Sequence, residues 1–155
     1  MTTRRKFLAL ACGAYASAAA AQLPPNIAAL RRQALQDAVD KVVGGATVRQ
    51  GRVKLVLPPL IENGNTVPLS VTVESPMTPA DHVKAIHVFT EKNPQPNVVS
   101  VHLTPRAGRA VLTTRARVAD SGTVLAVAQM SDGSFWSGSM NVVVTLSACL
   151  EDGLI

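Results

Sequence analysis

Residues 67–73 read Val-Pro-Leu-Ser-Val-Thr-Val, and their pattern is the clearest indication of the fold class. Its apolar side chains alternate with Pro68, Ser70 and Thr72, which is the two-residue period of a β-strand that buries one face. A turn signal, Asn-Gly-Asn at 63–65, precedes the stretch, and a proline-containing loop at 75–79 follows it. The stretch therefore predicts one short strand in a β-rich domain.

The same pattern of short strands and turns extends in both directions from residues 67–73. Further predicted strands cover residues 53–57, 83–91, 99–103, 110–118, 123–130 and 135–146. About seven strands separated by turn signals favour an all-β fold, an antiparallel β-sandwich with immunoglobulin-like architecture. The paired cysteines and central tryptophan of antibody domains are missing, so the comparison with immunoglobulins concerns architecture alone.

One helix is predicted before the strands. Asn26 can cap a helix whose apolar residues follow helical spacing from Ile27 to about Val43, and Gly44-Gly45 is a stop signal. We expect this helix to pack against the strands of the domain.

Residues 1–21 have the organisation of a twin-arginine signal peptide. Arg4-Arg5 precede an uncharged, alanine-rich stretch at 7–21, which closes on the small residues Ala19-Ala20-Ala21 typical of a cleavage site. The stretch is shorter than the roughly 20 residues of a membrane-spanning helix. We predict that export removes residues 1–21 and leaves a periplasmic domain at 22–155 with no membrane anchor.

Removal of the signal changes the charge of the chain. The whole chain carries a formal charge of +5, and residues 1–21 contain Arg4, Arg5 and Lys6 but no acidic residue, so +2 remains. No basic run with interleaved aromatic residues is present, and we therefore expect no nucleic-acid partner.

The sequence offers few groups for catalysis. His82 and His87, five residues apart near one strand, should point to opposite faces, and His102 lies on another strand. We interpret the three as independent histidines and expect no metal site. Asp81 beside His82 and Asp132 could belong to a hydrolytic triad, but no serine is singled out, and Asp132 with Gly133 is typical of a hairpin turn. We expect a protein that is not an enzyme.

Phe135 and Trp136 are neighbours on one predicted strand. One of the two should face the core and the other should face outward. An outward aromatic side chain would be a modest sign of an interaction surface.

Cys149 would be the only cysteine once the signal, with Cys12, is removed. It lies three residues beyond Leu146, which gives an extended reach of about 10 Å from the predicted end of the last strand. Two interpretations remain open: the thiol is presented to the cleft of another protein, or it is buried at the end of the strand.

Several separate motifs, in order, make the chain resemble the SoxY family of sulfur-oxidation carrier proteins. The motifs are Ile61-Glu62-Asn63-Gly64-Asn65-Thr66-Val67-Pro68, Ser75-Pro76-Met77-Thr78, Asp81-His82-Val83-Lys84, Ile86-His87-Val88-Phe89, Glu91-Lys92-Asn93-Pro94 and Ala126-Val127-Ala128-Gln129-Met130-Ser131-Asp132-Gly133-Ser134-Phe135. The resemblance runs from the predicted helix to the last strand, and the twin-arginine signal agrees with it.

The resemblance implies a periplasmic carrier with an immunoglobulin-like sandwich and a SoxZ-like partner. Members of the family end in a Gly-Gly-Cys-Gly-Gly arm whose cysteine holds sulfur intermediates covalently, without another cofactor. Partner enzymes attach thiosulfate, release sulfate by hydrolysis and oxidise the remaining sulfane sulfur. Cys149 stands at the position of the carrier cysteine.

Residues 147–151, Ser-Ala-Cys-Leu-Glu, keep the cysteine of that arm but none of its four glycines. Glycine gives an arm backbone freedom and a thin profile, whereas Leu150 and Glu151 add bulk and charge beside the thiol. We therefore carry two hypotheses. The chain is either a sulfur carrier of the SoxY type or a diverged, accessory binding module that has lost the carrier arm.

Overall fold

The computed structural model describes residues 26–146; the predicted signal peptide at 1–21 and Cys149 lie outside this range. Helix α2 (Ile27–Val43) comes first, and the short 3-10 helix η1 (Pro105–Ala107) lies between strands. The strands are β1 (Val48–Gln50), β2 (Val53–Val56), β3 (Leu60–Asn63), β4 (Val67–Val73), β5 (Val83–Thr90), β6 (Asn97–His102), β7 (Ala110–Ala116), β8 (Gly122–Met130) and β9 (Phe135–Leu146).

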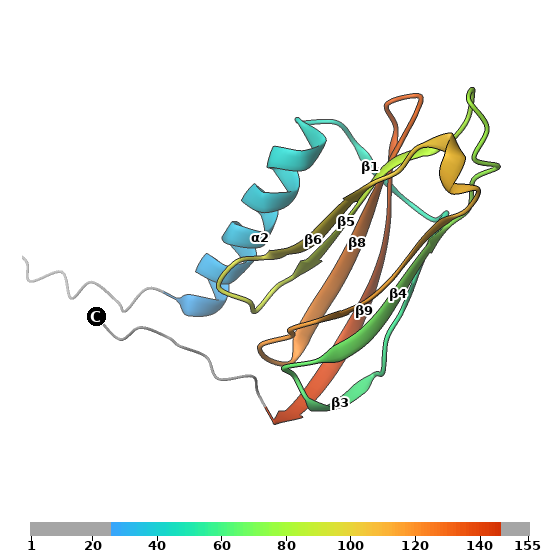
Figure 1. The fold of residues 1–155 in the computed structure, drawn as a ribbon. Helices are drawn as coiled ribbons and strands as arrows, with labels where there is room; N and C mark the ends of the chain where they lie inside the picture. Colours follow the sequence, from blue (N-terminus) through green and yellow to red (C-terminus); the bar gives the residue numbers. More distant parts are fainter. Residues whose placement is uncertain (1–25, 147–155) are drawn as a thin grey trace, which may run out of the picture.

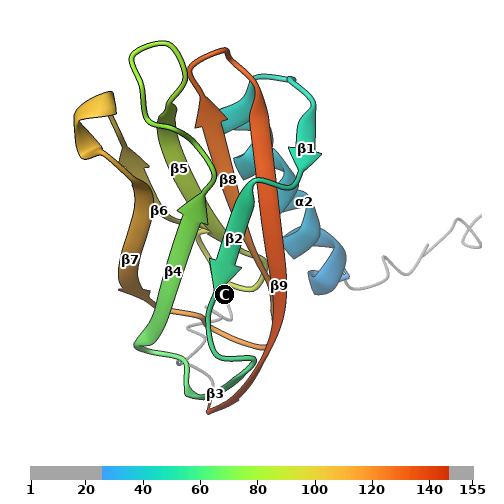
Figure 2. The same ribbon diagram turned by 90° about the vertical axis from the view of Figure 1, so that its right-hand side faces the viewer.

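Two sheets face each other across a common core (Figures 1 and 2). The large sheet has the strand order β1-β9-β8-β5-β6, with β3 also paired to β9, and the small sheet has the order β2-β4-β7. The predicted β-sandwich with a helix at its N-terminal side is therefore confirmed. Among the described residues, no helix has the length and apolar character needed to cross a membrane.

Two short strands were not predicted, and both differ from the expected antiparallel pairing. β1 and β3 run parallel to β9, with Val48 opposite Phe135 and Leu60 opposite Val143. β1 has three residues and β3 has four, which is too short for an alternating pattern to stand out in the sequence. The described part of the chain thus has nine strands, where about seven were expected, and its large sheet is mixed.

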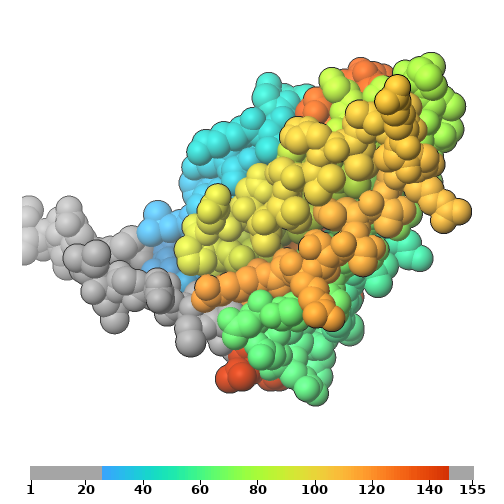
Figure 3. Space-filling view, in the orientation of Figure 1, coloured from blue at the N-terminus to red at the C-terminus, as the bar shows by residue number. Residues whose placement is uncertain are grey.

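Local sequence fixes both ends of α2. The side chain of Asn26 accepts a hydrogen bond from the Ala29 N–H (3.3 Å), and Gly44 ends the helix in the left-handed region with φ of +61°. Val39 and Val43 are its buried residues, and they pack on the outer face of the large sheet. In the space-filling view, α2 (blue) lies directly against the segment around β6 (yellow) (Figure 3).

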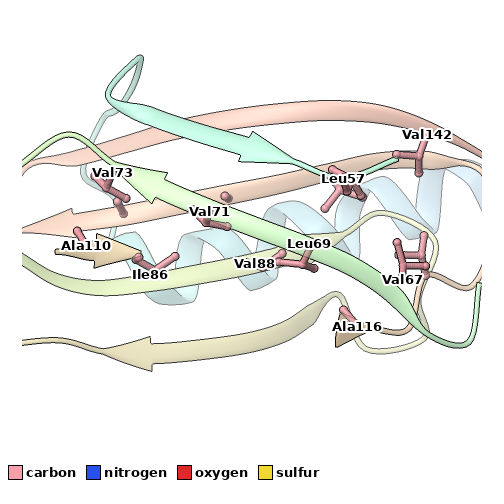
Figure 4. Close-up of a cluster of buried hydrophobic side chains, with 14 of the residues drawn as sticks. Leu57, Val67, Leu69, Val71, Val73, Ile86, Val88, Ala110, Ala116 and Val142 are labelled. Carbon is pink, nitrogen blue, oxygen red and sulfur yellow. The ribbon is translucent and has the colours of Figure 1, made fainter. Parts of the chain in front are cut away.

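Apolar side chains fill two separate clusters, one on each side of the large sheet. The main cluster lies between the sheets and includes Val71, Ile86 and Val88, which are all fully buried (Figure 4). The second cluster lies under α2 and contains Phe89 and Val127, also fully buried. Each such side chain contributes about 1.5–3 kcal/mol relative to exposure in water, so both clusters stabilise the layered arrangement.

The chain crosses from the large sheet to the small sheet between β1 and β2. Gly51 and Arg52 make the bend with φ of +112° and +56°, and Val53 then passes directly over Gly138 of β9. An added Cβ at Gly138 would overlap the carbonyl oxygen of Val53. This close backbone contact sets where β2 joins the sandwich.

Candidate functional site

β9 is the last described strand, and it ends three residues before Cys149. β9 ends at Leu146, whose carbonyl oxygen accepts a hydrogen bond from the Gly64 N–H (3.2 Å) beyond the end of β3. On the other side of the strand, Ser121 Oγ accepts a hydrogen bond from the Val144 N–H (2.8 Å). The last described residues are therefore held from both sides, and Leu146 lies three residues before Cys149 in the sequence.

Two of the three histidines lie together, which corrects the prediction that all three are independent. The rings of His87 on β5 and His102 on β6 have centroids 6.1 Å apart with an interplanar angle of 85°. Nδ1 of His87 lies 2.8 Å from Ser100 Oγ. The pKa of His87 is lowered below its ordinary value. Burial is the larger cause, and the nearby His102 is the smaller one. The rings meet because His87 is paired with Ser100 in the register of β5 and β6, and His102 lies two residues from Ser100 on the same face.

The third histidine and both aspartates have structural partners of their own. His82 lies in the loop before β5, where its Nδ1 is 3.2 Å from the Thr78 carbonyl oxygen. Asp132 Oδ1 accepts hydrogen bonds from the Ser134 N–H (2.9 Å) and hydroxyl (2.7 Å), and these bonds lower the pKa of Asp132. The N–H of Asp81 donates to Thr78 Oγ1 (3.1 Å) within the same loop as His82. The residues considered for a triad are thus hydrogen bonded to Thr78 or Ser134. Over residues 26–146, no group of three or more histidine, cysteine, aspartate or glutamate side chains could hold a metal ion.

Phe135 and Trp136 point to opposite faces of the large sheet, as predicted, but neither is fully exposed, because each packs against an apolar cluster. Phe135 is buried under α2, and Trp136 packs against the main cluster on the opposite side of the large sheet. The guanidinium carbons of Arg49 and Arg52 lie 5.7 and 5.2 Å from the indole ring centroid. These cation–π contacts cover the part of Trp136 that the core leaves open.

The histidine pair makes a testable prediction about acid stability. The pKa of His87 is lowered in the folded protein, so the unfolded chain binds a proton at a higher pH than the folded chain does. The free energy of unfolding should therefore decrease as the pH falls through 6.5 and below. His87→Gln should flatten this decrease between pH 7 and pH 5 in urea titrations. His82→Gln, in the loop before β5, should keep it. The same slope in His87→Gln and in the unmodified protein would contradict this assignment.

Comparison with known proteins places the chain in a sequence family. A family model described as "Sulfur oxidation protein SoxY" matches residues 39–149, so the matched segment ends on Cys149. A search of curated proteins finds no match.

Solved structures give a second comparison. The sulfur carrier protein SoxY from Chlorobium limicola f thiosulfatophilum is 26% identical with a TM-score of 0.63, over 74% of this chain and 99% of that one. Superoxide reductase (neelaredoxin) from Ignicoccus hospitalis is 17% identical with a TM-score of 0.54, over 61% of this chain and 80% of that one. The second likeness concerns the fold alone.

Proposed function

This chain belongs to the SoxY family of sulfur oxidation proteins, and from this we propose that it is a sulfur carrier that holds its cargo covalently on Cys149. The observation that carries the proposal is the family match over residues 39–149, which includes the cysteine as its last residue. The likeness to the SoxY sulfur carrier of Chlorobium supports the same role.

The fixed end of β9 suits a carrier. Leu146 is hydrogen bonded to Gly64, so the three residues from Leu146 to Cys149 start from a defined place on a rigid sandwich. A short tether of this kind raises the effective concentration of its thiol at a partner that binds the sandwich. The domain supplies position, and the partner enzyme supplies catalysis.

The chemistry requires only a thiolate on the carrier. When thiosulfate joins the Cys149 thiol, a sulfur–sulfur bond forms, the thiol proton leaves, and two electrons pass to an acceptor in the partner enzyme. Hydrolysis of the terminal sulfonate then consumes water, releases sulfate and leaves a persulfide on the cysteine. Thiolate is the reactive form in the first step, so loading should depend on the access and ionisation of this one residue.

We also propose a cellular location and binding partners for this chain. The Arg4-Arg5 pair and the apolar stretch up to Ala21 support export by the twin-arginine route to the periplasm, with removal of residues 1–21. A SoxZ-like subunit is the proposed partner of the sandwich, and enzymes of thiosulfate oxidation are the proposed partners of the Cys149 segment.

Intact-mass analysis tests the carrier role. The protein is incubated with its SoxZ-like partner, thiosulfate and the enzymes of thiosulfate oxidation. We expect covalent sulfur adducts on the unmodified protein and none on Cys149→Ser, because serine cannot form the sulfur–sulfur bond. Ser147→Ala, two residues away, is the control and should load normally.

An unmodified protein that forms no adduct under these conditions would contradict the carrier role. Retained binding of the SoxZ-like partner would then favour the second hypothesis, an accessory module without a working arm. Adducts that persist in Cys149→Ser would show that another residue carries the sulfur.

A further inference from the structure

An apolar groove lies on the outer face of the small sheet, the sheet nearer the viewer in Figure 2. Its volume is about 450 Å³, and its apolar lining comes from Val56, Leu57, Pro58, Pro68 and Leu69. The hydroxyls of Ser70 and Thr113, which also line it, lie 3.3 Å apart and hydrogen bond to each other. The groove therefore offers an apolar surface whose polar side chains are already engaged with one another.

Two cations lie beside this groove on the same face. Arg115 is directly opposite Pro68 in the register of β4 and β7, and Lys54 is two residues before Val56 on β2. Opposite residues in an antiparallel pair share a face, as do residues two apart on a strand. Both cations are exposed, and within residues 26–146 neither has a carboxylate partner.

The segment after β9 has the complementary chemistry. Residues 150–155 read Leu-Glu-Asp-Gly-Leu-Ile, which combines three apolar residues with two acids and contains no base. Burial of Leu154 and Ile155 would gain hydrophobic free energy, and Glu151 and Asp152 would meet the positive side of the groove.

The segment also begins close enough to the groove to reach it. Leu146 is hydrogen bonded to Gly64, and Gly64 is four residues from Pro68, a separation of at most about 14 Å along an extended chain. From Leu146 to Leu154 the chain can span up to about 28 Å. The segment can therefore enter the groove with length to spare.

We propose that residues 150–155 dock in this groove in cis and hold Cys149 against the small sheet until a partner displaces them. The proposal deepens the carrier function and rests on it for its biological meaning, since it concerns access to the same thiol. A tethered segment has an effective concentration on the order of millimolar, so even a weak docking site would be substantially occupied.

Thiol alkylation tests the docking without any sulfur enzyme. The full chain is treated with N-ethylmaleimide, and the modified peptide that contains Cys149 is followed by mass spectrometry. Leu154→Ser with Ile155→Ser should raise the alkylation rate about twofold or more, because the docked fraction is lost. Val56→Glu should do the same from the groove side, since it places an acid against the acidic segment.

Val111→Glu is the matched control. Val111 is an exposed valine on the outer face of the same sheet, at 43% exposure against 51% for Val56, but it does not line the groove. Its alkylation rate should equal that of the unmodified protein. In amide NMR spectra, the signals of Ser70 and Thr113 should shift when Leu154 and Ile155 are replaced.

Equal alkylation rates in all variants, together with unchanged signals from Ser70 and Thr113, would overturn the proposal. A rate that depends on protein concentration would also overturn it, because the segment would then dock on a second copy. Neither result would affect the sulfur-adduct experiment, and absence of adducts would leave a measured docking intact, so the two proposals fail separately.

Discussion

Phe89→Ala is expected to lower the free energy of unfolding by about 4 kcal/mol, within the range for loss of a large aromatic side chain from a core. Phe89 is fully buried on the helix side of β5, and it belongs to the cluster with Val39, Val43 and Phe135. Its removal leaves a cavity between the large sheet and α2. The helix has two buried residues, so it should detach more readily than the sheets separate.

Denaturant titration checks this prediction with two signals. Fluorescence of Trp136, the single tryptophan, reports on the sandwich, and circular dichroism reports on the helix. Val111→Ala, at an exposed position of β7, is the control and should change stability by less than about 0.5 kcal/mol. A loss below 1 kcal/mol in Phe89→Ala, by the fluorescence signal and by the dichroism signal, would contradict the packing of α2 on this sheet.

Gly138→Ala should destabilise the sandwich by about 3 kcal/mol, at the upper end of the usual cost of overpacking. The new methyl group would overlap the carbonyl oxygen of Val53 and lie 3.1 Å from its carbonyl carbon. A backbone carbonyl cannot rotate away as a side chain does, so β9 or the start of β2 must move.

Gly122→Ala on β8 is the matched control, because the added methyl group would meet the flexible side chain of Lys92, with Cγ at 3.0 Å. We expect it to cost less than about 1 kcal/mol, since that side chain can move aside. Thermal unfolding of the two variants in parallel measures the difference. Equal midpoints would show that the crossing over Gly138 is not a close backbone contact.

Most elements of the sandwich could be predicted from local patterns of residues. The predicted helix matches α2 at both ends, because Asn26 and Gly44 act within one turn of the helix and need no tertiary contact. The alternation at 67–73 matches β4, which buries Val67, Leu69, Val71 and Val73. Aspartate and glycine at 132–133 form the turn between β8 and β9, as predicted.

Pairings between strands that are far apart in the sequence were harder to predict from the sequence. β3 could be identified only from its pairing with β9 in the structure. Leu60–Asn63 is too short to show a pattern, and its partner Val143–Leu146 is some 80 residues away in the sequence. The same holds for Phe135, whose burial depends on α2 covering the outer face of the sheet. A strand pattern shows that a residue faces one side, but it does not show what covers that side.

From the sequence alone we could predict the helix, seven of the nine described strands, the family resemblance and the one cysteine downstream of the predicted signal. These properties depend on residue type and short-range spacing, which are written along the chain. Three features follow only from the folded structure: the hydrogen bond that holds the end of β9 at Leu146, the contact of His87 with His102, and the apolar groove of the small sheet, with Lys54 and Arg115 on the same face. Each of these depends on which strands become neighbours and in what register, and that is settled by the packing of the whole sandwich.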